Sequence, residues 1–163
     1  MIQMIDTGAS APAARAVTTK REWAADLSTQ RLYALLKLRV EVFVVEQAYF
    51  HPELDGEDLR SLTRHFWLER DDEVLCTLRL TEAGNGPDRV LRIGHMCTRR
   101  SERGKGHTTR LLQAALADVG SARCRIDSPS YLVDIYTGHG FVPCGDEILD
   151  NGVPVVPLVR DSK

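Results

Sequence analysis

The stretch from residue 98 to residue 108 reads TRRSERGKGHT, and it carries the clearest local signals in the chain. Gly104 and Gly106 permit positive φ angles and let backbone N–H groups approach a ligand closely. The helical pattern that begins at Thr108 leaves the N–H donors of its first turn unpaired, beside the positive end of the helix dipole. Basic residues outnumber acidic ones here. The stretch therefore predicts a polyanion-binding turn between a strand and a helix, with a solvated charged turn as the alternative interpretation.

Elements on both sides of this turn alternate between strand and helix patterns. The apolar positions after the turn follow helical spacing at 108, 111, 112, 115, 116 and 119. Strands are predicted over residues 65–68, 74–81, 89–98, 123–127, 141–149 and 153–159. Helices are predicted from the N-cap Ser28 to about Gln47, and from Ser128-Pro129 to about Gly138. We expect one α/β domain of mixed α+β type over residues 20–163, after a mobile tail over residues 1–19.

Composition and charge describe an ordinary globular chain. Its 163 residues are 43% hydrophobic and 27% charged, and 21 basic side chains face 23 acidic ones. This balance argues against a nucleic acid as the partner, and no apolar run approaches the roughly 18 residues of a membrane helix. The four cysteines form no CxxC pair, and no signal peptide is expected at the N-terminus. We therefore predict reduced thiols, no metal site and a cytoplasmic protein.

Two common nucleotide-binding motifs are absent from the turn. No Walker A string G-x-x-x-x-G-K-[ST] occurs, and the glycine pair lacks the third glycine of G-x-G-x-x-G. Residues 103–108 instead resemble the R-x-x-G-x-[GA] pyrophosphate loop of the GNAT acyltransferases, which bind acetyl-CoA. Arg103 and Gly106 match that loop. Thr108 stands in place of its final small residue, and His107 stands where an aliphatic residue is common.

Other segments resemble the ElaA-like branch of this superfamily, in the same order along the chain. They are residues 38–47 (LRVEVFVVEQ), 53–58 (ELDGED), 63–65 (TRH), Tyr136 with Gly140-Phe141, and 152–154 (GVP). The resemblance as a whole covers about residues 23–160. The chain departs from this branch at Pro129, where a polar residue is usual, and at Val155, where a histidine is usual. Both departures fall on the acceptor or pantetheine side.

The resemblance implies a GNAT-like fold: a central twisted, mixed and mostly antiparallel sheet flanked by about four helices. Two neighbouring parallel central strands, which end near Thr98 and Asp127, would splay apart. The pantetheine arm of acetyl-CoA would lie in the gap, against the backbone of residues 96–98, and the pyrophosphate would lie on the amides that follow. The donor-binding residues so implied are Met96, Cys97, Thr98, Arg103, Gly104, Lys105, Gly106, His107, Thr108 and Thr109.

The implied reaction is direct transfer of an acetyl group to an amine acceptor, a small molecule or a peptide. Tyr136 matches the tyrosine that lies beside the thioester sulfur in the family, and its hydroxyl can protonate the leaving thiolate as a general acid. A lysine-like amine is about 99.9% protonated at pH 7, so a base is needed before attack. Glu46 and His95 are the candidate bases, and His65 is a further one. For each of these three residues a structural hydrogen bond is the competing role.

Three other functions stay open at this point. One is a non-catalytic acyl-CoA-binding or sensing module, and another is a structural protein on the same fold. The third is acyl transfer to a homoserine-lactone-type acceptor, because the segment from Arg39 to Phe43 also resembles the corresponding segment of the synthases that catalyse this reaction. Asp55 and Glu57 are expected to flank the acceptor opening. The sequence leaves open both the identity of the acceptor and the oligomeric state, a homodimer included.

Overall fold

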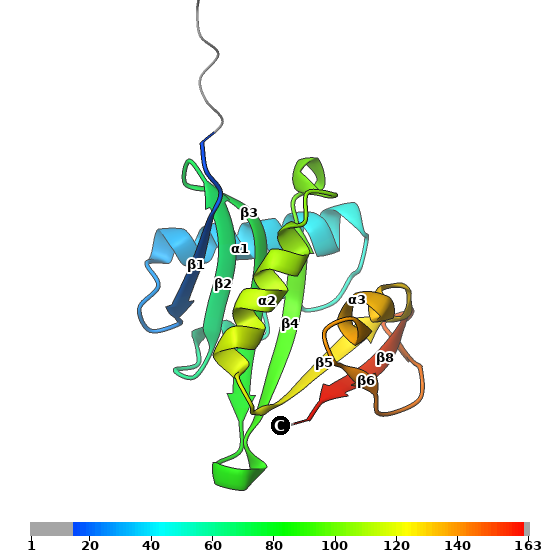
Figure 1. Ribbon diagram of the computed structural model, residues 1–163. Helices are drawn as coiled ribbons and strands as arrows, with labels where there is room; N and C mark the ends of the chain where they lie inside the picture. The colour runs from blue at the N-terminus through cyan, green and yellow to red at the C-terminus, as the bar shows by residue number, and fades with distance from the viewer. Residues whose placement is uncertain (1–14, 162–163) are drawn as a thin grey trace, which may run out of the picture.

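One mixed sheet of eight strands organises residues 15–161, the part of the chain that this computed structural model describes (Figure 1). The strand order is β1-β2-β3-β4-β5-β8-β6, and β7 pairs with β8 beside this path. The strands are β1 Thr18–Trp23, β2 Arg64–Arg70, β3 Glu73–Ala83, β4 Val90–Thr98, β5 Arg123–Pro129, β6 Val142–Pro143, β7 Ile148–Asp150 and β8 Val153–Arg160. Only β4 and β5 pair in parallel. The mixed, mostly antiparallel sheet is confirmed.

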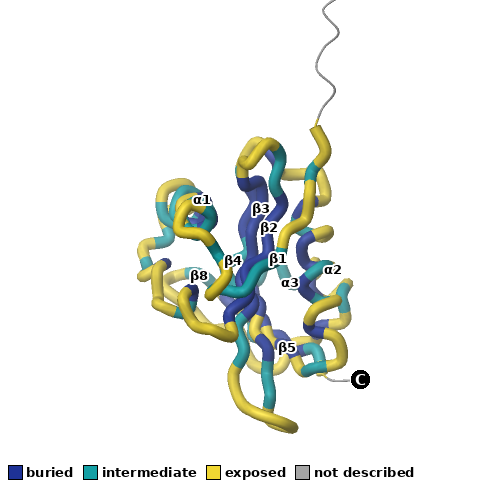
Figure 2. Tube along the Cα trace, turned by 90° about the vertical axis from the view of Figure 1, so that its left-hand side faces the viewer, coloured by how far each residue is buried: buried dark blue, intermediate teal, exposed yellow. Residues whose placement is uncertain are grey.

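Helices cover both faces of the sheet (Figures 1 and 2). On one face, α1 (Thr29–Arg39) continues into the π-helical segment η1 (Val40–Glu46). On the other face lie α2 (His107–Val119) and α3 (Val133–Thr137). Short 3₁₀ turns complete this part of the chain: η2 Glu57–Leu59, η3 Gly86–Asp88, η4 Arg100–Glu102 and η5 Ser130–Leu132. The predicted N-cap of α1 is confirmed, because Ser28 Oγ accepts a hydrogen bond from Arg31 N at 3.1 Å.

Two hydrophobic cores follow from this layering. The larger core lies between the sheet and α2, where Leu111, Leu112 and Ala115 form part of the predicted apolar stripe. The smaller core packs Leu35 and Leu38 of α1 against the opposite face. Burying one leucine side chain stabilises a fold by roughly 1.5–3 kcal/mol. These stripes therefore hold the two long helices on opposite faces, and the stripe of α2 fixes the position of the turn that precedes this helix.

The parallel strands β4 and β5 separate after a short contact. Their register joins Val90 to Arg123, Leu91 to Cys124 and Arg92 to Arg125, and no later pair is formed. Both strands run on, β4 to Thr98 and β5 to Pro129. The predicted splay is therefore confirmed, and it leaves one backbone edge of β4 free of strand partners over its second half.

Two expectations near the ends of elements are corrected. Thr18 and Thr19, placed in the tail, belong to β1 and pair with Glu69 and Leu68, and Val17 packs against the larger core; residues 1–14 of the predicted tail lie outside the described residues. Ser128-Pro129 does not cap a helix but ends β5, paired with β8. Antiparallel pairing extended β5 past the residues at which local capping signals predicted a helix start. The last helix, α3, begins only at Val133.

One C-terminal strand differs from the prediction. A continuous strand over 141–149 is wrong, because only the short strands β6 and β7 form; between them the chain bends, and Cys144 N donates a hydrogen bond to Pro157 O of β8 at 2.9 Å. The predicted turn at Asn151-Gly152 is confirmed: both residues have positive φ angles, 47° and 84°, and join β7 to β8.

No helix within residues 15–161 has the length and apolarity to cross a bilayer. No group of three or more His, Cys, Asp or Glu side chains among them is placed to hold a metal ion. All four cysteines are free thiols, and Cys144 is the exposed one.

Candidate active site

The glycine-rich turn between β4 and α2 forms a pocket at the end of β4. Gly104 and Gly106 have φ angles of 75° and 77°, in the left-handed region that other side chains rarely adopt. Gly106 is the N-cap of α2, and Arg110 N donates the first intrahelical hydrogen bond, to Gly106 O at 3.1 Å. The amides of residues 107–109 therefore lack helical partners, and these residues line the pocket. A Cβ on either glycine would meet no atom within 4 Å, so the space above the turn is open.

Most of the expected donor-binding residues gather at this pocket. Its lining includes Thr98, Arg103, Gly104, Gly106, His107, Thr108 and Thr109. Lys105 lies beside it, and Met96 and Cys97 lie upstream on β4. The departure at Thr108 has a structural use, because its Oγ1 lies 3.1 Å from Thr98 Oγ1 and ties the start of α2 to the end of β4.

A buried carboxylate supports the turn from below. Glu102 is only 6% exposed, and its carboxylate accepts hydrogen bonds from His107 Nε2 at 3.2 Å and Arg70 Nη2 at 2.5 Å. Lys105 Nζ lies 3.2 Å from the same carboxylate. Burial alone would raise its pKa, but these donors lower the pKa of Glu102 to about 2. The His107 imidazole thus points at Glu102, which explains how the turn accommodates a large side chain at this position.

Arg103 connects the turn to the end of η1. Its Nε donates to Thr98 O at 3.1 Å, and its two Nη groups donate to the Glu46 carboxylate at 2.5 and 3.0 Å. Glu46 is exposed, so burial does not make it a stronger base. Its hydrogen bonds with Arg103 lower the pKa of Glu46. A carboxylate with a lowered pKa is a weak base, and the geometry therefore argues against a base role for Glu46.

A bulge interrupts β4 in its splayed half. The register with β3 shifts between Thr77 and Arg79, so that His95 and Met96 together lie opposite Leu78. His95 has a φ of 50°, which is uncommon for a residue with a side chain and more so inside a strand. A bulge leaves its extra residue outside the ladder. This part of β4 therefore presents backbone polar groups toward the gap between β4 and β5.

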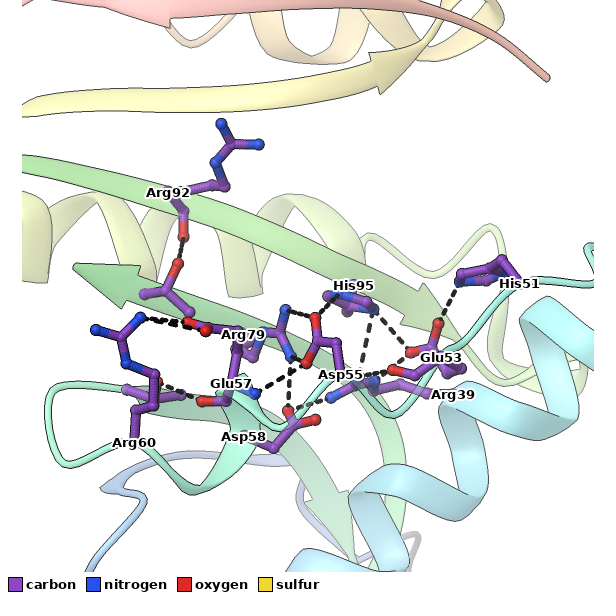
Figure 3. Close-up of polar contacts among 12 residues, drawn as sticks. Arg39, His51, Glu53, Asp55, Glu57, Asp58, Arg60, Arg79, Arg92 and His95 are labelled. Atoms are coloured by element: carbon purple, nitrogen blue, oxygen red, sulfur yellow. Dashed lines mark hydrogen bonds and ion pairs between the residues drawn. The ribbon is translucent and has the colours of Figure 1, made fainter. Parts of the chain in front are cut away.

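A buried network of charged side chains lies beside the bulge (Figure 3). Arg39 of α1 is 1% exposed; its Nε donates to Glu53 Oε1 and its Nη1 to Asp58 Oδ1, both at 2.5 Å. Arg79 of β3 donates to both oxygens of Asp55 at 2.8 Å, and its Nη1 lies 3.1 Å from Asp58 Oδ1. Buried charges of this kind persist because they are paired and hydrogen-bonded. We call these five residues the arginine–carboxylate network.

The two histidine base candidates differ in exposure, because the His95 side chain is 20% exposed whereas His65 is buried. His95 Nδ1 lies 2.8 Å from Glu53 Oε1, whereas its Nε2 lies 3.7 Å from Asp55 Oδ2, beyond hydrogen-bond distance. His65 is 1% exposed on β2, its Nε2 lies 3.0 Å from Asp58 O, and burial lowers its pKa. The structure therefore places His95 on the splayed half of β4 and encloses His65 in the fold.

The arginine–carboxylate network does not follow from the sequence patterns. Arg39, Glu53 and Asp55 lie in segments that resemble the ElaA-like branch, but their partners lie 14 to 24 residues away along the chain. An arginine within the apolar run of residues 38–45 was the available signal, because a buried arginine needs carboxylate partners. Which carboxylates those are depends on the fold of the loop after η1.

Tyr136 lies on α3 in the larger core. Its side chain is 5% exposed, its ring packs edge-on against Phe141 at 6.2 Å, and Met96 packs against the same core. Burial raises the pKa of Tyr136 to about 12. The phenol is therefore protonated at neutral pH, as a proton donor must be. No hydrogen bond engages its hydroxyl within residues 15–161, nor is that oxygen sealed from solvent.

Cys97, beside the bulge, is a core residue. Its side chain is buried in the smaller core, and burial raises the pKa of its thiol well above the usual range. Because the thiolate is the nucleophilic form, this cysteine is unsuited to forming an acyl-enzyme. The structure is thus consistent with direct transfer.

Comparison with known proteins identifies the family. The family described as "Acetyltransferase (GNAT) domain" matches residues 24–161. A UPF0039 protein of Mycobacterium tuberculosis is 61% identical over 142 residues, 86% of this chain and 91% of that protein. Protein ElaA of Escherichia coli is 28% identical over 140 residues, 83% of this chain and 91% of that protein.

Two crystal structures have the same fold. An acyl-CoA N-acyltransferase from Pseudomonas aeruginosa aligns with a TM-score of 0.82 at 31% identity, covering 89% of this chain and 99% of that one. Escherichia coli ElaA aligns with a TM-score of 0.83 at 25% identity, covering 90% of this chain and 100% of that one. With the open turn at the start of α2 and the splayed edge of β4, these similarities establish that the chain belongs to the GNAT acetyltransferase family, in which it is an ElaA-like acyltransferase.

Proposed function

We propose that this protein is an acetyl-CoA-dependent N-acetyltransferase that transfers the acetyl group directly to an amine. One observation carries the proposal: the free edge of β4 leads straight into the αL-glycine turn at the start of α2. The turn offers unpaired amides, open space and the cationic Arg103, which suit a diphosphate. The residues present therefore fit the phosphate end of a coenzyme A thioester.

The edge of β4 supplies the positioning for the acyl end. Backbone groups of residues 96–98 are placed to hydrogen-bond an extended amide-containing arm, as one further strand would. We assign the N–H of Met96 at the bulge as the donor to the thioester oxygen, because a fixed amide there stabilises the negative charge that develops on attack. Cys97 contributes its backbone only.

Two side chains carry the proton transfers in this proposal. His95 accepts a proton from the acceptor ammonium, because its Nε2 is the ring nitrogen without a hydrogen bond. Tyr136 donates its phenolic proton to the leaving thiolate, and its burial keeps that proton in place until the thiolate forms. Glu46 has no part in this scheme.

The cellular setting belongs to the same proposal. We infer that the protein works in the cytoplasm on a small-molecule or peptide amine, because four free thiols are typical of a reducing compartment. The three buried cysteines are packed in the cores and need no other role.

Calorimetric titration with acetyl-CoA tests the donor half of the proposal first. We expect binding in the micromolar range, and faster release of free coenzyme A when an amine is added. Binding without any amine-dependent release would instead support the non-catalytic acyl-CoA sensor. No binding would overturn both readings.

Replacing Tyr136 tests the protonation of the leaving thiolate. Tyr136→Phe removes only the hydroxyl, so we expect kcat to fall about tenfold or more with unchanged acetyl-CoA affinity. Tyr131→Phe is the matched control, because Tyr131 is 73% exposed on the neighbouring turn. A loss of affinity with unchanged kcat in Tyr136→Phe would contradict the general-acid role.

A further inference from the structure

The two histidines that contact Glu53 differ in what their second ring nitrogen meets. His51 is engaged on both sides, with Nε2 at 2.8 Å from Glu53 Oε2 and Nδ1 at 2.9 Å from Tyr49 O. His95 is engaged on one side only, through Nδ1 at 2.8 Å from Glu53 Oε1. Its Nε2 points toward Asp55 without forming a hydrogen bond (Figure 3). His51 thus fixes the loop, whereas His95 keeps a nitrogen free.

The contact with Glu53 decides which nitrogen of His95 carries the proton. Burial would raise the pKa of Glu53, but its hydrogen bonds with His95 and Arg39 and the positive charge of Arg39 lower that pKa, so the Glu53 oxygen is an acceptor at neutral pH. Two acceptors 2.8 Å apart would repel, so Nδ1 must carry the hydrogen. Arg39 Nη2 lies farther from Nδ1, at 3.3 Å. Nε2 is therefore the nitrogen with the lone pair.

The surroundings hold His95 in this position. Its backbone is in the left-handed region at the bulge, and such a conformation persists only where neighbouring groups over-determine it. Glu53 is 4% exposed and is itself fixed by Arg39. Phe43 of η1 packs edge-on against the imidazole, with ring centroids 6.4 Å apart. The groups that face the ring are thus Arg39, Glu53, Asp55 and Phe43.

Asp55 is the one exposed carboxylate of the arginine–carboxylate network. Its side chain is 34% exposed, against 3% for Glu53 and 5% for Asp58. Hydrogen bonds from Arg79 hold its pKa far below the usual range, so it is charged at any pH of interest. A carboxylate has about four acceptor positions. Arg79 and the amide of Glu57 use three, which leaves one on Oδ2, the oxygen that faces His95 Nε2.

We propose that His95 Nε2 and Asp55 Oδ2 form the subsite for the acceptor nitrogen, that Glu53 is a positioning residue for His95, and that the acceptor is therefore an alkylamine that arrives as an ammonium ion. This inference rests on the proposed N-acetyltransferase function. Asp55 attracts and orients the ammonium, and His95 Nε2 removes one proton from it. The amine lone pair attacks the thioester carbon, the C–S bond breaks, and the second proton of nitrogen reaches the thiolate by way of Tyr136. The products are an amide, a thiol and one proton on His95, which passes to solvent.

The first experiment reads the His95 tautomer without any turnover. Long-range ¹⁵N–¹H correlation spectra of protein labelled with ¹⁵N-histidine, recorded at pH 8, distinguish a protonated ring nitrogen from one with a lone pair. We expect His95 to carry its hydrogen on Nδ1, assigned by loss of its signals in His95→Asn. Asparagine is the replacement because it tolerates the left-handed backbone. A hydrogen on Nε2 would overturn the inference.

The second experiment compares an ammonium acceptor with a neutral one. Benzylamine is cationic at pH 7.5, whereas aniline is neutral, so the two probe the charge at the acceptor nitrogen. We expect Asp55→Asn to lower kcat/KM for benzylamine at least tenfold, mainly through KM, and for aniline less than threefold. Asp161→Asn is the matched control, because it removes a carboxylate from an exposed contact with Arg123 and should change neither value. Equal losses for both amines would overturn the role of Asp55.

The third experiment separates positioning by Glu53 from mere support of the fold. In Glu53→Gln the negative charge beside Nδ1 is lost, which disfavours the imidazolium. We expect the low-pH limb of the kcat/KM profile to move to lower pH and the plateau to fall at least tenfold. Glu69→Gln removes a carboxylate from another arginine contact, that with Arg31, and should leave the limb in place. If the low-pH limb of the kcat/KM profile does not move in a folded Glu53→Gln protein, Glu53 has only a structural role.

The outcomes distinguish this inference from the proposed function. Failure to bind acetyl-CoA in calorimetry overturns the N-acetyltransferase and the acceptor subsite together. Binding of acetyl-CoA with turnover that prefers aniline, or that ignores Asp55→Asn, overturns the subsite alone. His95→Asn should lower kcat at least 100-fold with acetyl-CoA affinity unchanged.

Discussion

The turn over residues 98–109 and the arginine–carboxylate network differ in the groups that they offer to a charged ligand. The turn presents backbone amides, and its side chains serve mainly to hold the backbone in place, as Thr108 and His107 do. The network presents side chains brought from α1, η2, β3 and the loop before η2. A backbone site tolerates substitution wherever the φ angles survive. A side-chain site depends on each member, because every charge is the partner of another.

The largest effect should come from breaking the network at its centre. Arg39→Leu leaves Glu53 and Asp58 buried without their shared cation, so we expect the free energy of unfolding to fall by about 3–5 kcal/mol. Urea denaturation followed by circular dichroism measures it. Arg60→Leu, which breaks an exposed pair with Glu57, should cost no more than about 1 kcal/mol. Equal losses would show that burial does not distinguish the network.

The turn should respond to backbone conformation and charge instead. Gly106→Glu places a negative charge and a strained φ at the phosphate position, and we expect acetyl-CoA affinity to fall at least tenfold, about 1.4 kcal/mol. Gly120→Glu is the matched control at the opposite end of α2, where φ is also positive and the space is open. Calorimetry on both folded variants decides the matter. Unchanged affinity in Gly106→Glu would refute the turn as the phosphate site.

The contribution of Glu102, which lies beneath the turn, should be measurable in how the free energy of unfolding depends on pH. The pKa of Glu102 is about 2 in the fold against an ordinary 4.5, so its ionised form stabilises the native state above pH 5. That contribution is lost as the pH falls from about 5 toward 2. Glu102→Gln lacks it, and its free energy of unfolding should therefore fall less steeply over this range. If the free energies of unfolding of the two proteins change with pH in parallel, Glu102 does not stabilise the turn.

The smallest effect is expected at the contact between η1 and the turn. Glu46→Gln frees the exposed Arg103, so acetyl-CoA affinity should rise by no more than about threefold, the scale of a surface ion pair. The kcat/KM profile against pH should keep its shape. A loss of 100-fold or more in kcat would restore Glu46 as the base.

The two regions also differ in how far the sequence predicts them. The turn follows from local rules, since Gly104 and Gly106 sit between a strand pattern and a helix pattern, and its placement was correct. The network forms only because the loop after η1 returns to β3, and no local sequence pattern specifies the course of that loop. Ser128-Pro129 shows the converse case: a sound capping signal was overridden by pairing of β5 with β8. Local chemistry predicted this fold wherever long-range pairing did not compete with it.

The short register between β4 and β5 has a consequence for the cooperativity of the fold. Among the described residues, the three pairs between β4 and β5 are the only ladder that joins strands β1–β4 to strands β5, β8, β6 and β7. The second group has fewer ladder bonds to break when it separates from the first. In hydrogen exchange under native conditions, amides of β5 and β8 should therefore exchange as one subglobal unit, before those of β2 and β3. This short ladder would also determine how widely the gap between β4 and β5 can open to admit and release its ligands.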